Sequence, residues 1–134
     1  LFRRGGFATI APKEGEQVQG LLWSITQSCE RSLDRYEGYP RFYDKRMVTV
    51  RDAEGRSLSV MAYIMDERFR EPMLPTDTYY NGILEGYRQN GLPVAALKKA
   101  WEHAVQEVHQ ETERTNASFT NYTRPPKRRG SYDR

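Results

Sequence analysis

The residues at positions 33–40, which read Leu-Asp-Arg-Tyr-Glu-Gly-Tyr-Pro, predict the end of a short helix followed by a sharp stop. Thr26 can cap the start of this helix, and apolar residues follow it at helical spacing. Gly38 can adopt the positive φ that ends a helix, and Pro40 prevents the helix from resuming. We therefore expect a helix that begins after Thr26 and stops at Gly38.

The carboxylate of Glu37 points inward in this prediction, because Glu37 follows Leu33 by four positions and shares its buried face. Desolvation between Tyr36 and Tyr39 should raise the pKa of this carboxyl group, which is typical of a general base. A structural carboxylate satisfied by its neighbours is the alternative, and the residues alone favour it slightly. Asp34 lies off the buried face and is expected to be solvated.

Four segments have the apolar patterns of strands. Two of them, 41–51 and 57–65, alternate in polarity and flank a turn at 52–56, so they predict an antiparallel hairpin. The other two, 6–10 and 17–25, also predict strands, and Pro12 and Gly15 end the first of these. The first half of the chain is therefore expected to build the sheet.

Two helices are predicted in the second half. Thr76 can cap a helix over residues 77–89, in which aromatic and aliphatic residues form one apolar stripe. Pro93 opens a second helix at the position that proline favours, and apolar residues continue at three- and four-residue spacing. The pattern predicts that this helix frays near Thr115.

The chain divides into a domain over residues 1–115 and a basic tail over residues 116–134. The tail lacks periodicity, and its last part, 124–134, holds five Lys or Arg against one Asp in a chain of net charge +3. Binding of nucleic acid through this tail is one hypothesis. A solvated, mobile end is favoured by roughly three to one, because terminal charge runs are usually solvated.

The content of reactive residues limits the classes of function. Cys29 is the single cysteine, which excludes an internal disulfide and suits the reducing cytoplasm, where we expect this protein. His103 and His109 are six residues apart and so lie on different helix faces, which disfavours a metal site. No apolar run is long enough to span a membrane, so no membrane association is expected. No cofactor is expected either.

Several short pieces occur in an order and at spacings that carry a resemblance. They are Gly-Phe-Ala-Thr-Ile at 6–10, Val-Gln-Gly-Leu-Leu-Trp at 18–23, Leu-Asp-x-x-Glu-Gly at 33–38, Tyr43 before Val48 and Val50, Tyr-Ile-Met at 63–65, Pro75 followed by Tyr79 and Ile83, and Gly-Leu-Pro at 91–93. On these residues the chain resembles the γ-glutamylcyclotransferase family from about residue 6 to residue 93. The Leu-Asp-x-x-Glu-Gly element is the most specific piece.

The resemblance implies an α+β fold, a small mixed and mostly antiparallel β-barrel or sheet with two to three packed helices. It also implies cleavage of a γ-glutamyl amide or peptide into 5-oxoproline and a free amine, with Glu37 as the catalytic acid/base. The residues implied to bind the substrate are Tyr43, Tyr63, Tyr79 and Gly38. With the resemblance counted, Glu37 is favoured as a site residue over a structural one by roughly two to one.

The family's Tyr-Gly-Ser-Asn element, whose backbone N–H groups hold the substrate, does not occur in this chain. Three interpretations stay open. The sequence is part of an active enzyme, or a partner supplies the missing element in a homo-oligomer, or the protein is a catalytically inactive, oligomerising relative that binds a γ-glutamyl ligand or a protein partner. The expected partners are therefore a small γ-glutamyl substrate and a second copy of the chain, whereas nucleic acid is disfavoured.

Overall fold

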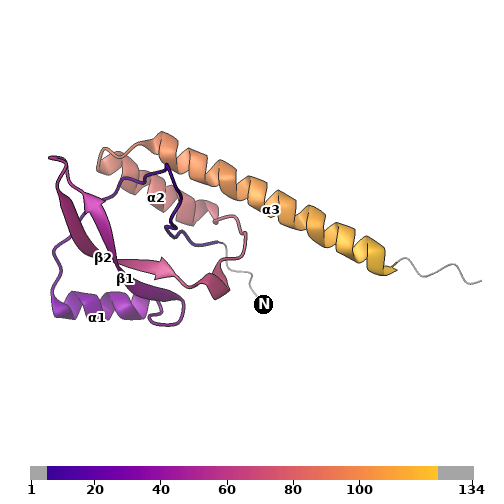
Figure 1. The fold of residues 1–134 in the computed structure, drawn as a ribbon, viewed down its shortest axis with the longest axis horizontal. Coiled ribbons are helices and arrows are strands. Elements are labelled where there is room, and N and C mark those ends of the chain that lie inside the picture. Colours follow the sequence, from indigo (N-terminus) through magenta and orange to yellow (C-terminus); the bar gives the residue numbers. More distant parts are fainter. Residues whose placement is uncertain (1–5, 124–134) are drawn as a thin grey trace, which may run out of the picture.

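The structure is a computed structural model that describes residues 6–123, and it has the α+β class that the sequence predicts (Figure 1). Helices and a β-hairpin alternate along the chain rather than forming separate halves. The elements are α1 (Gln27–Tyr36), β1 (Tyr43–Arg51), β2 (Ser57–Met65), the 3-10 helix η1 (Glu67–Phe69), α2 (Asp77–Gln89) and α3 (Val94–Thr123).

The predicted hairpin is confirmed. β1 and β2 pair antiparallel in a register that places Tyr43 opposite Met65 and Arg51 opposite Ser57. The carboxylate of Asp52 closes the turn between them, since it accepts hydrogen bonds from backbone N–H groups of the turn, including that of Arg56 at 2.8 Å. Because aspartate binds backbone N–H groups in this way, its presence in a short polar segment helps to predict a turn from the sequence.

The predicted strands at 6–10 and 17–25 are wrong, and of the two predicted forms, a barrel or a sheet, the structure has the sheet. Within residues 6–123, β1 and β2 are the only paired strands, and their sheet does not close. Residues 17–25 are all exposed and make no hydrogen bond to other described residues. An alternating apolar segment becomes a strand only where a neighbouring strand offers its N–H and C=O groups. No such neighbour lies beside this segment.

Residues 6–10 are held by single hydrogen bonds to distant segments, not by the strand pairing that the predicted strand would make. The N–H of Gly6 donates to the carbonyl of Leu74 at 2.8 Å, and the hydroxyl of Thr9 accepts from the N–H of Met65 at 2.9 Å. A Cβ at Gly6 would lie 2.7 Å from the carbonyl oxygen of Met73, so this close approach requires glycine. The segment therefore bridges the end of β2 and the loop before α2.

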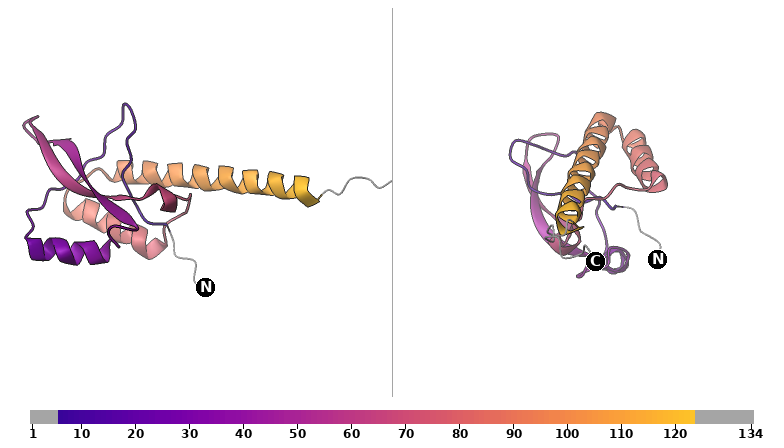
Figure 2. Two further views of the ribbon diagram at one scale, coloured as in Figure 1. Left: turned by 60° about the horizontal axis from the view of Figure 1, so that its bottom comes forward. Right: turned by 90° about the vertical axis from the view of Figure 1, so that its right-hand side faces the viewer.

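The helix α2 has its predicted bounds and its predicted cap, because the hydroxyl of Thr76 accepts from the N–H of Tyr79 at 3.2 Å. The helix α3 begins just after Pro93 as predicted but continues past Thr115 to Thr123. Residues 116–123, assigned to the tail, are therefore helical, whereas residues 124–134 lie outside the described part of the chain. α2 and α3 lie side by side, and α3 extends well beyond the other elements (Figures 1 and 2).

The apolar core is small. Among the described residues only Ile64 and Leu97 are buried hydrophobics, at 6% and 9% exposure. Ile64 belongs to one face of the hairpin, and Tyr43, Lys45 and Tyr63 belong to the other, since directly opposed residues point to the same side. The second face meets α1 through the polar contacts described below.

Candidate functional site

Glu37 is the C-terminal capping residue of α1. Its N–H donates to the carbonyl of Leu33 at 2.8 Å, and its own backbone is still helical with φ −81° and ψ −6°. The next residue, Gly38, has φ +66°, which turns the chain away from the helix axis. The predicted helix end is thus confirmed, and it places the Glu37 side chain at the corner between α1 and β1.

The environment of this carboxylate raises its pKa in the predicted direction. Glu37 is half-buried, and burial raises the pKa of its carboxyl group above the usual value, because removal from water disfavours the charged form. The enclosure differs from the prediction, however. Tyr36 is 83% exposed and Tyr39 is 39% exposed, so Tyr36 contributes little of this burial.

Gly38 is needed for steric reasons as well as for its backbone angle. A Cβ at this position would lie 2.8 Å from a ring carbon of Phe42. The N–H groups of Arg41 and Phe42 both donate to the carbonyl of Gly38 at 2.9 Å, which brings the Phe42 ring onto the glycine. A substrate-binding role for Gly38 stays a prediction.

Tyr43 and Tyr79 are brought together through Ala8. The hydroxyl of Tyr43 donates to the carbonyl of Ala8 at 2.7 Å, and the N–H of Ala8 donates to the hydroxyl oxygen of Tyr79 at 3.0 Å. The ring of Tyr79 also packs edge-on against Phe7, with 5.2 Å between centroids. No hydrogen bond within residues 6–123 uses the proton of the Tyr79 hydroxyl or a lone pair of the Tyr43 hydroxyl, so both can bind another group.

Tyr43 also lies near Glu37. Burial, followed by the negative charges that Tyr79, Glu37 and Tyr36 can carry, raises the pKa of Tyr43 to about 12. These groups therefore interact electrostatically across the gap between β1, α2 and the end of α1. Three of the predicted site residues, Glu37, Tyr43 and Tyr79, form one cluster.

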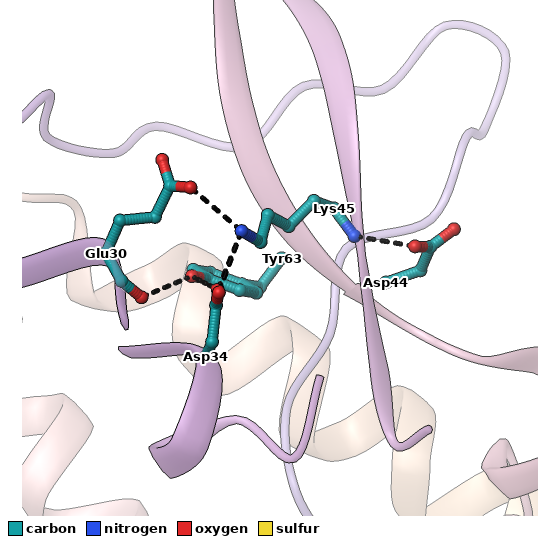
Figure 3. A network of polar contacts seen from close by, with 5 residues as sticks. All are labelled: Glu30, Asp34, Asp44, Lys45 and Tyr63. Atoms are coloured by element: carbon teal, nitrogen blue, oxygen red, sulfur yellow. Dashed lines mark hydrogen bonds and ion pairs between the residues drawn. The ribbon is translucent and has the colours of Figure 1, made fainter. Parts of the chain in front are cut away.

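Tyr63 belongs to a second, neighbouring cluster (Figure 3). Its hydroxyl lies 2.5 Å from Oδ1 of Asp34, to which it donates, and 3.4 Å from the carbonyl of Glu30. Burial, followed by this contact with Asp34, raises the pKa of Tyr63 to about 12. A substrate-binding role for the Tyr63 hydroxyl stays a prediction, and in this structure the hydroxyl binds Asp34 and Glu30 of α1.

Lys45 completes the second cluster, and the sequence analysis did not single it out. Its Nζ lies 2.8 Å from Oδ1 of Asp34 and 2.9 Å from Oε2 of Glu30 (Figure 3). The expectation that Asp34 is solvated is therefore wrong, because its side chain is only 24% exposed and binds both Lys45 and Tyr63. The alternation of the strand could have indicated Lys45, because it places Lys45 on the same face as the predicted site residue Tyr43.

Other kinds of site find little support in the described residues. No group of three or more His, Cys, Asp or Glu within residues 6–123 could hold a metal ion. Cys29 is exposed rather than part of the core. An open groove between α2 and α3 is lined by other residues than those predicted, namely Pro75, Asp77, Tyr80, Lys98 and Trp101. No helix of the described part has both the length and the apolarity to cross a bilayer.

Comparisons with known proteins agree on one family. The sequence profile of the AIG2-like family matches residues 17–100. The chain is 35% identical over 96 residues to bovine (Bos taurus) gamma-glutamylcyclotransferase, which is 71% of this chain and 50% of that protein. Identity is 33% to the human (Homo sapiens) protein of that name over the same shares, and 33% to the mouse (Mus musculus) protein over 66% of this chain and 47% of that one.

The chain spans about half the length of these relatives. No solved structure matches it significantly. The matched range includes the Leu-Asp-x-x-Glu-Gly element at the end of α1, the whole hairpin and α2. The chain belongs to the AIG2-like family and is a relative of the gamma-glutamylcyclotransferases.

Proposed function

We propose that this chain takes part in γ-glutamyl cyclotransferase chemistry, the cleavage of a γ-glutamyl amide or peptide into 5-oxoproline and a free amine. The observation that carries the proposal is the half-buried Glu37, whose pKa burial raises and which interacts electrostatically with Tyr43, whose hydroxyl is joined to that of Tyr79 through Ala8. The names of the bovine, human and mouse relatives support the same reaction class.

The reaction joins two groups of one substrate molecule. Glu37 accepts a proton from the α-ammonium group, and the freed amine attacks the γ-carbonyl carbon to form the ring C–N bond. The C–N bond to the leaving group then breaks. Two protons leave the α-nitrogen in total and two reach the leaving nitrogen, which departs as an ammonium ion, so Glu37 ends as the carboxylate it began as. The enzyme mainly has to hold the ring-closing pose.

Burial of Glu37 lowers the cost of the first proton transfer. A model glutamate has a pKa of about 4.3 and an α-amino group one of about 8, so the mismatch of about 4 units amounts to roughly 5 kcal/mol. The raised pKa of Glu37 narrows this gap, as in other enzymes that use a buried carboxylate as a base. Tyr43, Tyr63, Tyr79 and Gly38 complete the proposed substrate site.

The test is 5-oxoproline release from a panel of γ-glutamyl amino acids, peptides and amines. Glu37→Gln keeps the size of the side chain but removes the base, so it should abolish turnover while the far-UV circular dichroism spectrum stays unchanged. Glu71→Gln, at an exposed carboxylate in the loop before α2, is the matched control and should stay active. Turnover retained by Glu37→Gln would remove Glu37 from the mechanism.

A second proposal, supported by a different observation, is a non-catalytic relative that associates with a second copy of itself. Within residues 6–123, each strand of the hairpin has one edge that pairs with no further strand. Five apolar residues of the segment 17–25 are exposed, at 41–78%: Val18, Leu21, Leu22, Trp23 and Ile25. Exposed strand edges and apolar patches favour association.

Sedimentation velocity over a range of concentrations separates the two proposals. A dimer that persists in Glu37→Gln, combined with no 5-oxoproline release by the wild-type chain, would favour the non-catalytic relative. A folded monomer that releases 5-oxoproline would exclude it. The division into a domain over 1–115 and a tail over 116–134, and the cytoplasmic location, remain parts of the proposal.

A further inference from the structure

Lys45 contacts the chain on both sides of Glu37. Its Nζ lies 2.8 and 2.9 Å from the two carboxylate oxygens of Asp34, which precedes Glu37 by three residues. The same Nζ lies 4.4 Å from the ring centroid of Tyr39, which follows Glu37 by two residues, close enough for a cation–π interaction. One side chain from β1 thus binds the residues that flank the proposed base.

The ion pair between Lys45 and Asp34 is partly shielded from water, which strengthens it. The side chains of Lys45 and Asp34 are 20% and 24% exposed, so water screens their charges only in part. Tyr63 adds a third partner, since it lies directly opposite Lys45 in the hairpin and donates to Asp34. Charge-assisted hydrogen bonds of this kind are about twice as strong as neutral ones.

The end of α1 depends on this polar cluster because little else attaches it. No residue of α1 is fully buried, so the helix does not dock on the hairpin through an apolar stripe. Its C-terminal turn is closed by three backbone hydrogen bonds. The N–H groups of Glu37, Gly38 and Tyr39 donate to the carbonyls of Leu33, Arg35 and Asp34 at 2.8, 3.3 and 2.9 Å. Figure 3 shows Lys45 reaching from the strand to the helix at this point.

We propose that Lys45 is a positioning residue, which holds the last turn of α1 against the hairpin and so keeps Glu37 at the corner between α1 and β1. The catalytic consequence rests on the proposed function, whereas the positioning itself does not. Lys45 does not transfer protons in this proposal, because its ammonium group is occupied by Asp34 and Glu30.

Amide hydrogen exchange measured by NMR tests the positioning without any assay of activity. In Lys45→Met, the N–H groups of Glu37 and Tyr39 should exchange about tenfold faster or more, because the last turn opens locally. Arg46→Met is the matched control, since Arg46 is the next residue of β1, points to the other face and is 61% exposed. Unchanged exchange at both amides in Lys45→Met would overturn the proposal.

Two further variants keep the test decisive if Lys45→Met does not fold. Asp34→Asn removes the charge that Lys45 binds but keeps the side-chain size, and it should accelerate exchange at the same amides. Lys45→Arg keeps the cation and its place over the Tyr39 ring, so it should restore slow exchange. Fast exchange in Lys45→Arg, with the fold intact, would contradict the assigned contacts.

Turnover tests the catalytic consequence. In Lys45→Met, kcat per folded molecule should fall about 10- to 100-fold with little change in KM, since a displaced base costs rate even when substrate still binds. Lys45→Arg should recover most of the loss, and Arg46→Met should match the wild type. A folded Lys45→Met with normal kcat would overturn the catalytic role. If the wild-type chain releases no 5-oxoproline, the proposed function fails, and the exchange data alone decide whether Lys45 positions α1.

Discussion

Residues 27–65 form the helix and hairpin that their sequence predicts, whereas residues 17–25 do not form the strand that theirs predicts. The first region forms α1 and the hairpin with nearly the predicted bounds, although α1 has no fully buried residue. The second is more apolar, yet it is exposed throughout and has no regular structure. Caps, turns and ion pairs contribute to the order of the first region, whereas the apolar alternation of the second has no partner strand among the described residues.

The largest effect should come from the few buried side chains of the ordered region. Ile64→Ala should lower the free energy of unfolding by about 2–4 kcal/mol, because it removes buried methyl groups and leaves a cavity. Ile64 is 6% exposed, one of only two buried hydrophobics among the described residues. Urea unfolding followed by circular dichroism measures the change. A loss of unfolding free energy below about 0.5 kcal/mol, typical of surface positions, would show that Ile64 is not part of a packed core.

The same glycine-to-alanine substitution can be compared in the two regions, at Gly38 and at Gly20. Gly38→Ala should cost about 1–2 kcal/mol, since an L-residue at φ +66° is strained and its Cβ would press on the Phe42 ring. Gly20→Ala in the exposed segment should be neutral or slightly stabilising, because a Cβ there meets nothing within 4 Å and the unfolded chain loses freedom. The same urea titration compares them. Equal costs at the two sites would contradict the difference between the regions.

The pH dependence of stability should reflect the polar cluster of the ordered region. The hydrogen bond and charge of Lys45 and the Tyr63 hydroxyl lower the pKa of Asp34. Its contribution is therefore complete above the unfolded pKa of about 3.9 and is lost as the pH falls through the lower folded value. Asp34→Asn should remove this part of the acid sensitivity in urea midpoints measured between pH 7 and pH 2.

Glu37 should act in the opposite direction, because burial raises its pKa. It stabilises the fold below its unfolded pKa and loses that contribution as the pH rises through the folded value. Glu37→Gln should therefore be at least as stable as the wild type at pH 7.

For the Asp34 prediction, an Asp34→Asn variant with the acid sensitivity of the wild type would show that the ion pair between Lys45 and Asp34 is not maintained in solution.

The smallest effect is expected in the exposed segment. Trp23 is 78% exposed, so Trp23→Ser should change the free energy of unfolding of the monomer by no more than about 0.5 kcal/mol. The measurement is made at low protein concentration, where association is minimal. A loss above 1 kcal/mol that persists on dilution would mean that residues 17–25 pack within the chain after all.

Much of the candidate site could be predicted because it depends on short-range signals. The cap at Thr26, the stop at Gly38 and the four-residue step from Leu33 to Glu37 are local, and the structure confirms each of them. The raised pKa of Glu37 follows from its inward direction. The pairing of Lys45 with Asp34 was missed because eleven residues separate them, and only the docking of α1 on the hairpin brings them together.

Local signals in the sequence are enough to place both ends of α1 and α2, the start of α3 and the turn of the hairpin, since these follow from dihedral preferences and from periodicity over a few residues. The tertiary structure was needed to show where α3 ends, which apolar segments become strands, which of the predicted tyrosines interact with Glu37 and which side chain binds Asp34. Those outcomes depend on distant parts of the chain offering hydrogen-bond partners and burial, which no local pattern contains.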